Sequence, residues 1–161
     1  MNSAIISDCK TYRYTLSRSP RRPKPEYGPV LWCLLNPSKA NSELDDPTSR
    51  RVMGFSDLWR CDGSTIVNTY ALRATDPKKL WEHEDPVGPE NDFYLDKLAR
   101  ECRVVVCAWG VNAKPDRVKK VVAIFKKAGA NMFCLGVTHH GHPRHPLYVR
   151  ADQPLVPWEM P

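Results

Sequence analysis

Four short apolar runs recur along this chain, and they constrain its fold more than any other feature. The runs read VLWCLLN, STIVNTYAL, RVVVCAWG and NMFCLGV. A continuous apolar run of strand length is typical of a strand covered on both faces of a parallel sheet. Helical patterns fill the segments between the runs, and strands that alternate with helices form crossover units. The sequence therefore predicts a three-layer α/β/α sandwich with a mostly parallel central sheet of about four strands.

Helix boundaries support this order. The segment DDPTSRRVMGFSDLWRCDG offers Asp46 as a cap, Pro47 at the first helical position and Gly63 as its close. The segment KPDRVKKVVAIFKKAGA places valines and a phenylalanine on one face and lysines on the other, and it ends at Gly129. A short helical piece and a longer helix are expected within residues 75–102. These helices would cover the sheet.

The ends of the chain differ from its middle. KTYRYTLS alternates polar and apolar residues, which predicts an N-terminal edge strand with one wet face. Residues 18–29 are rich in Arg, Lys and Pro and predict a basic loop, and residues 150–161 form a Pro-rich tail. We expect a single domain over residues 1–161 with its core at about 27–149.

Composition restricts location and partners. The first residues lack a basic stretch followed by an apolar one, and no apolar run approaches a membrane span, so we expect a cytoplasmic protein without membrane contact. The six cysteines form no CxxC pair and are expected to be mostly reduced. The net charge of +6 suits a polyanionic partner, although many basic proteins bind no nucleic acid.

Polar residues at the ends of the predicted strands form the candidate site. In open sheets of this kind, ligands bind outside the carboxyl ends of the strands. Those ends carry Asn36, Asn68, Trp109 with Gly110, and the loop HHGHPRHPLYV. These residues lie far apart in the sequence, and we expect the fold to bring them to one rim.

Each amide at this rim has an ordinary structural alternative. Asn36, followed by Pro and Ser, is typical of a turn, and its amide can also hold a water molecule in a fixed position. Asn68 lies in an apolar strand and must find hydrogen-bond partners. It is either a satisfied core amide or a reader of a base edge, because an amide offers both a donor and an acceptor.

The loop after the fourth run holds four of the five histidines. His140 and His142 are two residues apart, which would allow a metal pair, but no cysteine or carboxylate lies beside them in the sequence. The prolines stiffen the loop while His142, Arg144 and His145 present donors to an anion. This arrangement favours stabilisation of developing negative charge over metal binding, and we expect no metal and no cofactor. A plain surface loop is the third interpretation.

Five segments in order resemble an uncharacterised bacterial and phage family, Domain of Unknown Function 1643 (DUF1643). They are LLNPSKANSELDDPT, VNTYALRATDP, DPVGPEND, AWG and CLGVTHHGHPRHPLYV. The resemblance runs over roughly Tyr27 to Val149, which is most of the chain. The family name states no activity.

The same order of motifs is distantly similar to the uracil-DNA glycosylase superfamily. This similarity implies that Asn36 positions the attacking water, that Asn68 reads the base, and that His142 or His145 supports the leaving base. Cleavage of an N-glycosidic bond develops positive charge on the sugar and negative charge on the base, so an amide and an imidazole are enough without a metal.

Further roles follow from the similarity. An extruded base needs an aromatic surface, which Phe55 would supply, with Trp59 and Tyr70 as other choices. Phosphate contacts would come from Arg144, Ser38 and Arg73, together with the basic loop Arg18 to Lys24. The chain departs from the superfamily at Ser38, where many of these glycosylases have Gly, and in the form of its final motif, HPRHPLY.

These observations lead to one expected function and two alternatives. We expect a metal-independent enzyme that acts on a nucleobase or nucleotide, most concretely a DNA glycosylase-like hydrolase whose partner is nucleic acid, DNA in the first place. The first alternative is a noncatalytic module of the same fold that binds nucleotide or nucleic acid. The second alternative is a metal-dependent hydrolase that uses the loop from His139 to His145.

Overall fold

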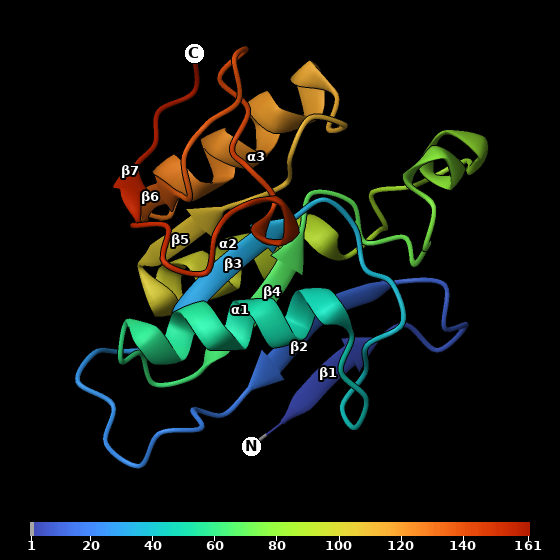
Figure 1. Ribbon diagram of the computed structural model, residues 1–161. Coiled ribbons are helices and arrows are strands. Elements are labelled where there is room, and N and C mark those ends of the chain that lie inside the picture. The colour runs from blue at the N-terminus through green and yellow to red at the C-terminus, as the bar shows by residue number, and fades with distance from the viewer. Residues whose placement is uncertain (1) are drawn as a thin grey trace.

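The computed structural model describes residues 2–161 and gathers their strands into one mixed sheet of seven strands (Figure 1). The order across the sheet is β1-β2-β4-β3-β5-β6-β7. The strands are β1 (Ser3–Ile6), β2 (Arg13–Arg18), β3 (Val30–Leu34), β4 (Ser64–Asn68), β5 (Val104–Cys107), β6 (Asn131–Cys134) and β7 (Val156–Pro157). The four apolar runs supply β3 to β6.

Antiparallel strands flank the centre of the sheet on both sides. Neighbours within β4-β3-β5-β6 pair in parallel, whereas β1 with β2, β2 with β4, and β6 with β7 pair antiparallel. The four predicted strands therefore pair in parallel, but the prediction of a mostly parallel sheet of about four strands is not confirmed. The sheet of the described residues has seven strands, and its pairings are mixed. The strands outside the four apolar runs are β1, β2 and β7. β1 and β7 are short, and β2 follows β1 in a hairpin, so none of them appears in the sequence as a long apolar run.

The predicted N-terminal edge strand also needs correction. Residues 13–17 of that segment lie in β2, which ends one residue later at Arg18 and is second in the sheet because β1 pairs outside it. The two strands form a hairpin in which the Ser7 backbone N–H donates to Tyr12 O at 2.9 Å. The edge of the sheet is thus β1, with alternate residues exposed, and β2 is buried.

Helices cover both faces of the sheet. Helix α1 (Pro47–Leu58) packs on one face, and α2 (Asn91–Cys102) and α3 (Pro115–Lys127) pack on the other (Figure 1). Two short 3-10 helices complete the elements, η1 (Pro77–Glu82) and η2 (Pro146–Tyr148). Within residues 2–161, no helix combines the length and the apolar character needed to cross a membrane.

The predicted boundaries of α1 hold at its start and fail at its end. Asp46 caps the helix, and its carboxylate accepts from the Ser49 backbone N–H at 2.8 Å. The helix stops at Leu58 rather than at Gly63, because Arg60 adopts a positive φ of 59°. Gly63 instead begins the turn into β4, where an added Cβ would lie 2.4 Å from Arg18 O.

A buried polar contact fixes α1 to the central strand. The Trp32 indole of β3 stacks on Trp59 with ring centroids 5.5 Å apart, and its Nε1–H donates to Ser56 Oγ at 3.0 Å. Ser56 in turn donates to Val52 O at 2.8 Å. This contact holds the helix in one position on the sheet, and the first turn of that helix forms part of the cavity described below.

We expect Ser56→Ala to destabilise the protein by about 1–3 kcal/mol, because the buried Trp32 N–H loses its acceptor. Urea denaturation gives the free energy of unfolding. Ser42→Ala, at an exposed position, serves as the control and should change it by less than about 0.5 kcal/mol. Equal stability of both variants would show that the Trp32 contact does not hold α1.

Candidate functional site

A cavity of about 510 Å³ opens at the carboxyl ends of the parallel strands. Asn36 follows β3, Ala74 lies in the loop after β4, Trp109 follows β5, and His145 lies in the loop after β6. The first turn of α1 supplies another wall with residues 46–49. Because the carboxyl ends of parallel strands meet at one edge, these distant segments enclose a common space.

Asn36 lines this cavity, and its side chain keeps one free acceptor. Its side-chain Nδ2 donates to Ala74 O at 2.8 Å, to Pro37 O at 3.1 Å and to Leu72 O at 3.4 Å. Carbonyl oxygens only accept, so the nitrogen must face them and Oδ1 must face away. The amide therefore ties the loop after β3 to the loop after β4 and leaves Oδ1 able to accept a hydrogen bond.

His145 presents a neutral donor. Its Nδ1 accepts from the Leu147 backbone N–H at 3.2 Å, as the cap of η2, so the proton of the neutral ring is on Nε2. Burial lowers the pKa of His145 to about 4, against the opposing effect of the nearby Asp46 carboxylate. At neutral pH this imidazole is uncharged and can donate from Nε2.

Backbone hydrogen bonds hold the histidine loop in place. Gly110, with a φ of 75°, donates its N–H to Pro143 O at 2.9 Å, and the Arg144 N–H donates to Gly136 O at 3.0 Å. From α1, Arg51 donates to Pro146 O at 3.2 Å and to Val149 O. His145 is therefore fixed between the end of β5 and α1.

Two charged residues that the sequence did not mark as functional also line the cavity, Arg13 and Asp46. Arg13 is 3% exposed and donates from Nη1 to Ala40 O at 2.9 Å. Burial lowers the pKa of Arg13 to about 10, and the Asp46 carboxylate opposes this shift. The sequence showed Asp46 only as a helix cap, and it placed Arg13 in a strand expected to have one wet face.

A bulge turns Arg13 toward the cavity. In the pairing of β1 with β2, Ile5 faces Thr15 and Ile6 faces Arg13, so Tyr14 is an extra residue. Arg13 and Leu16 consequently line the same cavity although they are three residues apart, while Tyr14 packs into the core on the other face of the sheet. Strict alternation along the strand does not predict this placement.

The predicted site residues divide into two groups. Asn36, His145, Ser38 and Arg144 line the cavity together. The others do not line it, and they are Asn68, His142, Phe55 and Arg73. Only part of the predicted set therefore meets in one place.

Phe55 and Asn68 are both buried, for different reasons. Phe55 is 2% exposed and packs against the rings of Trp32 and Trp59, so it cannot stack on a base in the cavity. Asn68 is 1% exposed, and within residues 2–161 its side-chain nitrogen and oxygen have no hydrogen-bond partner. It lies two residues beyond Ile66, which lines the cavity, and therefore projects on the same face of β4.

His142 and Arg73 are held mainly through the backbone. The His142 N–H donates to Thr138 Oγ1 at 3.2 Å, and the Arg73 N–H donates to Thr11 O at 3.0 Å. His139 and His140 are exposed, with ring centroids 5.1 Å apart. In the described part of the chain, no group of three or more His, Cys, Asp or Glu side chains is arranged to hold a metal ion.

A second, shallower hollow of about 440 Å³ lies beside α1. Four arginines and Phe55 are among the residues that line it. The arginines are Arg21, Arg22, Arg50 and Arg51. Arg51 connects this hollow with the first cavity, because it also holds η2 through Pro146 and Val149.

Comparison with known proteins identifies a family and nothing closer. The family model described as "Protein of unknown function (DUF1643)" matches residues 13–147, a range that includes Arg13, Asn36, Asp46 and His145. No curated protein and no solved structure matches the chain.

The low pKa of His145 predicts a pH dependence of stability. The unfolded chain binds a proton near the ordinary value of 6.5, whereas the folded chain binds it only near 4. The free energy of unfolding should therefore fall as pH decreases from about 6.5 to about 4. Below about pH 4 the part that comes from His145 should stay constant. His145→Asn keeps an acceptor for the Leu147 N–H and should remove this part of the slope.

NMR titration of the imidazole Cε1–H measures the same property directly. We expect a midpoint near 4 for His145, and a midpoint near the ordinary 6.5 would show that the ring is solvated and free to charge.

Proposed function

The chain belongs to the DUF1643 family, whose description names no activity, so we propose its function from the cavity itself. The proposed function is a metal-independent hydrolase that cleaves the N-glycosidic bond of a nucleobase, most concretely in DNA. One observation carries this proposal. Asn36 and His145, from loops more than a hundred residues apart in the chain, line the same cavity, and the first carries a free acceptor and the second a neutral donor.

The two residues fit the needs of the reaction. Water forms a new bond to C1′ of the sugar as the C1′–N bond breaks, and the electron pair leaves on the base. Asn36 Oδ1 accepts from the attacking water and orients it, and the Nε2–H of His145 donates to the base as negative charge develops there. The water proton passes to solvent, and the departed base takes up a proton.

The environment strengthens both interactions. The walls of the cavity include the buried apolar side chains of Leu34, Ile66 and Trp109, which lower the polarity of its inner part. A hydrogen bond to a developing charge is stronger in such a medium than in water. A neutral histidine also avoids the cost of placing a fixed positive charge in this space.

Arrangement and charge support a polymeric substrate. The cavity is lined by Arg144 and by Tyr148, which is 79% exposed, and Arg51 of the arginine-lined hollow beside α1 donates to Pro146 O of η2. A strand whose base enters the cavity would have cationic side chains near its phosphates on both sides. The distant likeness to the uracil-DNA glycosylase superfamily and the parallel run β4-β3-β5-β6 support the same class.

A noncatalytic binding module is the second candidate. The hydrogen bonds that the Asn36 nitrogen donates to three carbonyl oxygens favour it, because they give this residue a structural role without catalysis. Catalysis and binding differ in their response to loss of the free acceptor at Asn36.

Base release from a panel of oligonucleotides with deaminated or alkylated bases, measured by mass spectrometry, tests the proposal. We expect the wild-type protein to release at least one base and Asn36→Ala to lower the rate by about 100-fold or more. Binding of the same oligonucleotide should change by less than about threefold. Asn131→Ala, at an exposed position at the start of β6, provides the matched control and should keep the wild-type rate.

The outcomes separate the candidates. If no base is released from any oligonucleotide but binding persists and weakens with salt, the binding module replaces the hydrolase. If neither release nor salt-dependent binding occurs, both candidates are wrong.

A further inference from the structure

Arg13 and Asp46 carry opposite charges in the same cavity but form no salt bridge with each other. Both line it, and the nearby Asp46 carboxylate favours the charged form of Arg13, yet within residues 2–161 Arg13 joins no carboxylate in a salt bridge. Six other arginines of the described residues do join a carboxylate, and they are Arg18, Arg21, Arg60, Arg100, Arg117 and Arg150. A ligand bound between Arg13 and Asp46 could form hydrogen bonds with both side chains.

The donors of Arg13 are largely unused. Nη1 donates to Ala40 O, and within the described residues Nε is buried without a partner. A buried guanidinium with unfilled N–H groups costs free energy that a ligand with suitably placed acceptors would recover. The guanidinium fork is planar, so it matches two acceptors that lie in one plane.

Asp46 has the complementary capacity. One carboxylate oxygen accepts from the Ser49 N–H as the cap of α1, and within residues 2–161 the other accepts no hydrogen bond. A carboxylate only accepts, so the ligand must offer a donor on this side. The occupant therefore carries two coplanar acceptors next to a donor.

We propose that the cavity binds a 6-oxopurine base, such as hypoxanthine or guanine, with Arg13 donating to O6 and N7 and Asp46 accepting from N1–H. The inference rests on the proposed function in taking a nucleobase as the substrate, and it names the class of base. Arginine donating to O6 and N7 is the commonest specific contact between a protein and guanine.

Other occupants satisfy fewer of these groups. Adenine has a donor where a 6-oxopurine has O6, and it would oppose Arg13 there. Uracil has no ring acceptor corresponding to N7, so it accepts only one of the two hydrogen bonds that the Arg13 guanidinium can donate. A phosphate would meet the Asp46 carboxylate, which repels it. The volume of about 510 Å³ and the apolar walls formed by Leu16, Leu34 and Ile66 suit a planar bicyclic ring.

Asn68 adds a polar group beneath the same face. Its side-chain nitrogen and oxygen are buried, and within residues 2–161 they are unpaired. Residues 13 and 68 thus place unfilled hydrogen-bonding groups on one face of two neighbouring strands, β2 and β4. Buried polar atoms without partners are uncommon in folded proteins, so Arg13 Nε and the Asn68 amide are candidates for contact with a ligand on the cavity side of the sheet, whereas Asn91 Oδ1 lies on α2.

Calorimetric titration of the full chain with nucleosides tests the inference without requiring turnover. We expect 2′-deoxyinosine and 2′-deoxyguanosine to bind at least ~10-fold more tightly than 2′-deoxyadenosine and 2′-deoxyuridine. Two altered ligands isolate the contacts while the protein stays intact. 7-Deaza-2′-deoxyinosine lacks N7 and 1-methylinosine lacks N1–H, and each should bind about 10-fold more weakly than its parent nucleoside.

Protein variants assign the contacts to side chains. Arg13→Lys keeps a positive charge but loses the planar guanidinium, and Asp46→Asn keeps the helix cap but loses the negative charge. Each variant should bind 2′-deoxyinosine at least ~10-fold more weakly than the wild-type protein. Arg117→Lys removes another buried guanidinium, on α3 outside the cavity, and should leave the affinity unchanged. Where a variant melts at a much lower temperature, the altered ligands decide the question alone.

Several results would overturn the inference. They are equal or tighter binding of 2′-deoxyuridine or 2′-deoxyadenosine, full affinity for the altered ligands, and displacement of 2′-deoxyinosine by inorganic phosphate at comparable concentration. Binding of 6-oxopurines without base release would reject the hydrolase and keep this site. Release of another base with no effect of Arg13→Lys would keep the hydrolase and reject this site.

Discussion

The parallel pairing of β3 with both β4 and β5 is the constraint on which the rest of this structure depends. Parallel neighbours require a crossover of the chain, so each of these strands delivers its following loop to the same edge of the sheet. The crossovers contribute α1 to one face and α2 to the other, which buries nearly all residues of β3, β4 and β5. The cavity exists because these loops meet there and because α1, fixed through Trp32, closes one side.

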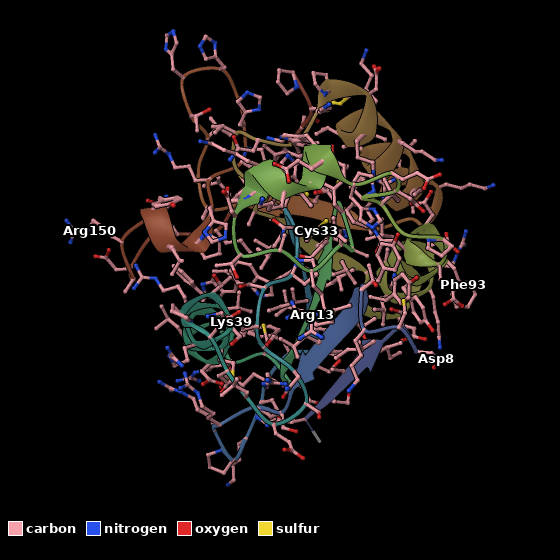
Figure 2. The ribbon with its side chains drawn as sticks, turned by 90° about the vertical axis from the view of Figure 1, so that its right-hand side faces the viewer. Asp8, Arg13, Cys33, Lys39, Phe93 and Arg150 are labelled. Carbon is pink, nitrogen blue, oxygen red and sulfur yellow. The ribbon has the colours of Figure 1, made fainter. Side chains whose placement is uncertain are left out.

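Low solvation is the property that the cavity residues share. It keeps His145 uncharged, makes the unpaired Arg13 costly, and would strengthen any hydrogen bond from Asn36 to a bound water. Arg13 on β2 is buried, whereas Arg150 is exposed to water and lies at the outline of the molecule in Figure 2. The site combines an uncharged donor, an amide acceptor, and a cation and an anion that form no salt bridge. Such a site recognises a polar planar ligand better than a simple anion.

Sequence patterns predicted those parts of the molecule that depend on local chemistry. The runs that became β3, β4 and β5 are apolar because they are covered on both faces, whereas β6 is only partly buried. Asn36 and His145 were located from their places after β3 and β6. Strand β1 was missed because only alternate residues of its four are covered. Arg13 was missed because a bulge at Tyr14 decides its direction, and Phe55 was misplaced because its burial depends on two tryptophans from other segments.

Mapping of a bound nucleoside on the ¹H–¹⁵N NMR spectrum tests the central claim most directly, which is that the cavity at the strand ends is the functional site. On addition of 2′-deoxyinosine, the largest shifts should occur at backbone N–H groups of the lining, those of Gly110, His145 and Leu147, and at the side-chain signals of Arg13. Shifts confined to the arginine-lined hollow around Arg22 and Arg50, or no shifts at saturating nucleoside, would contradict it.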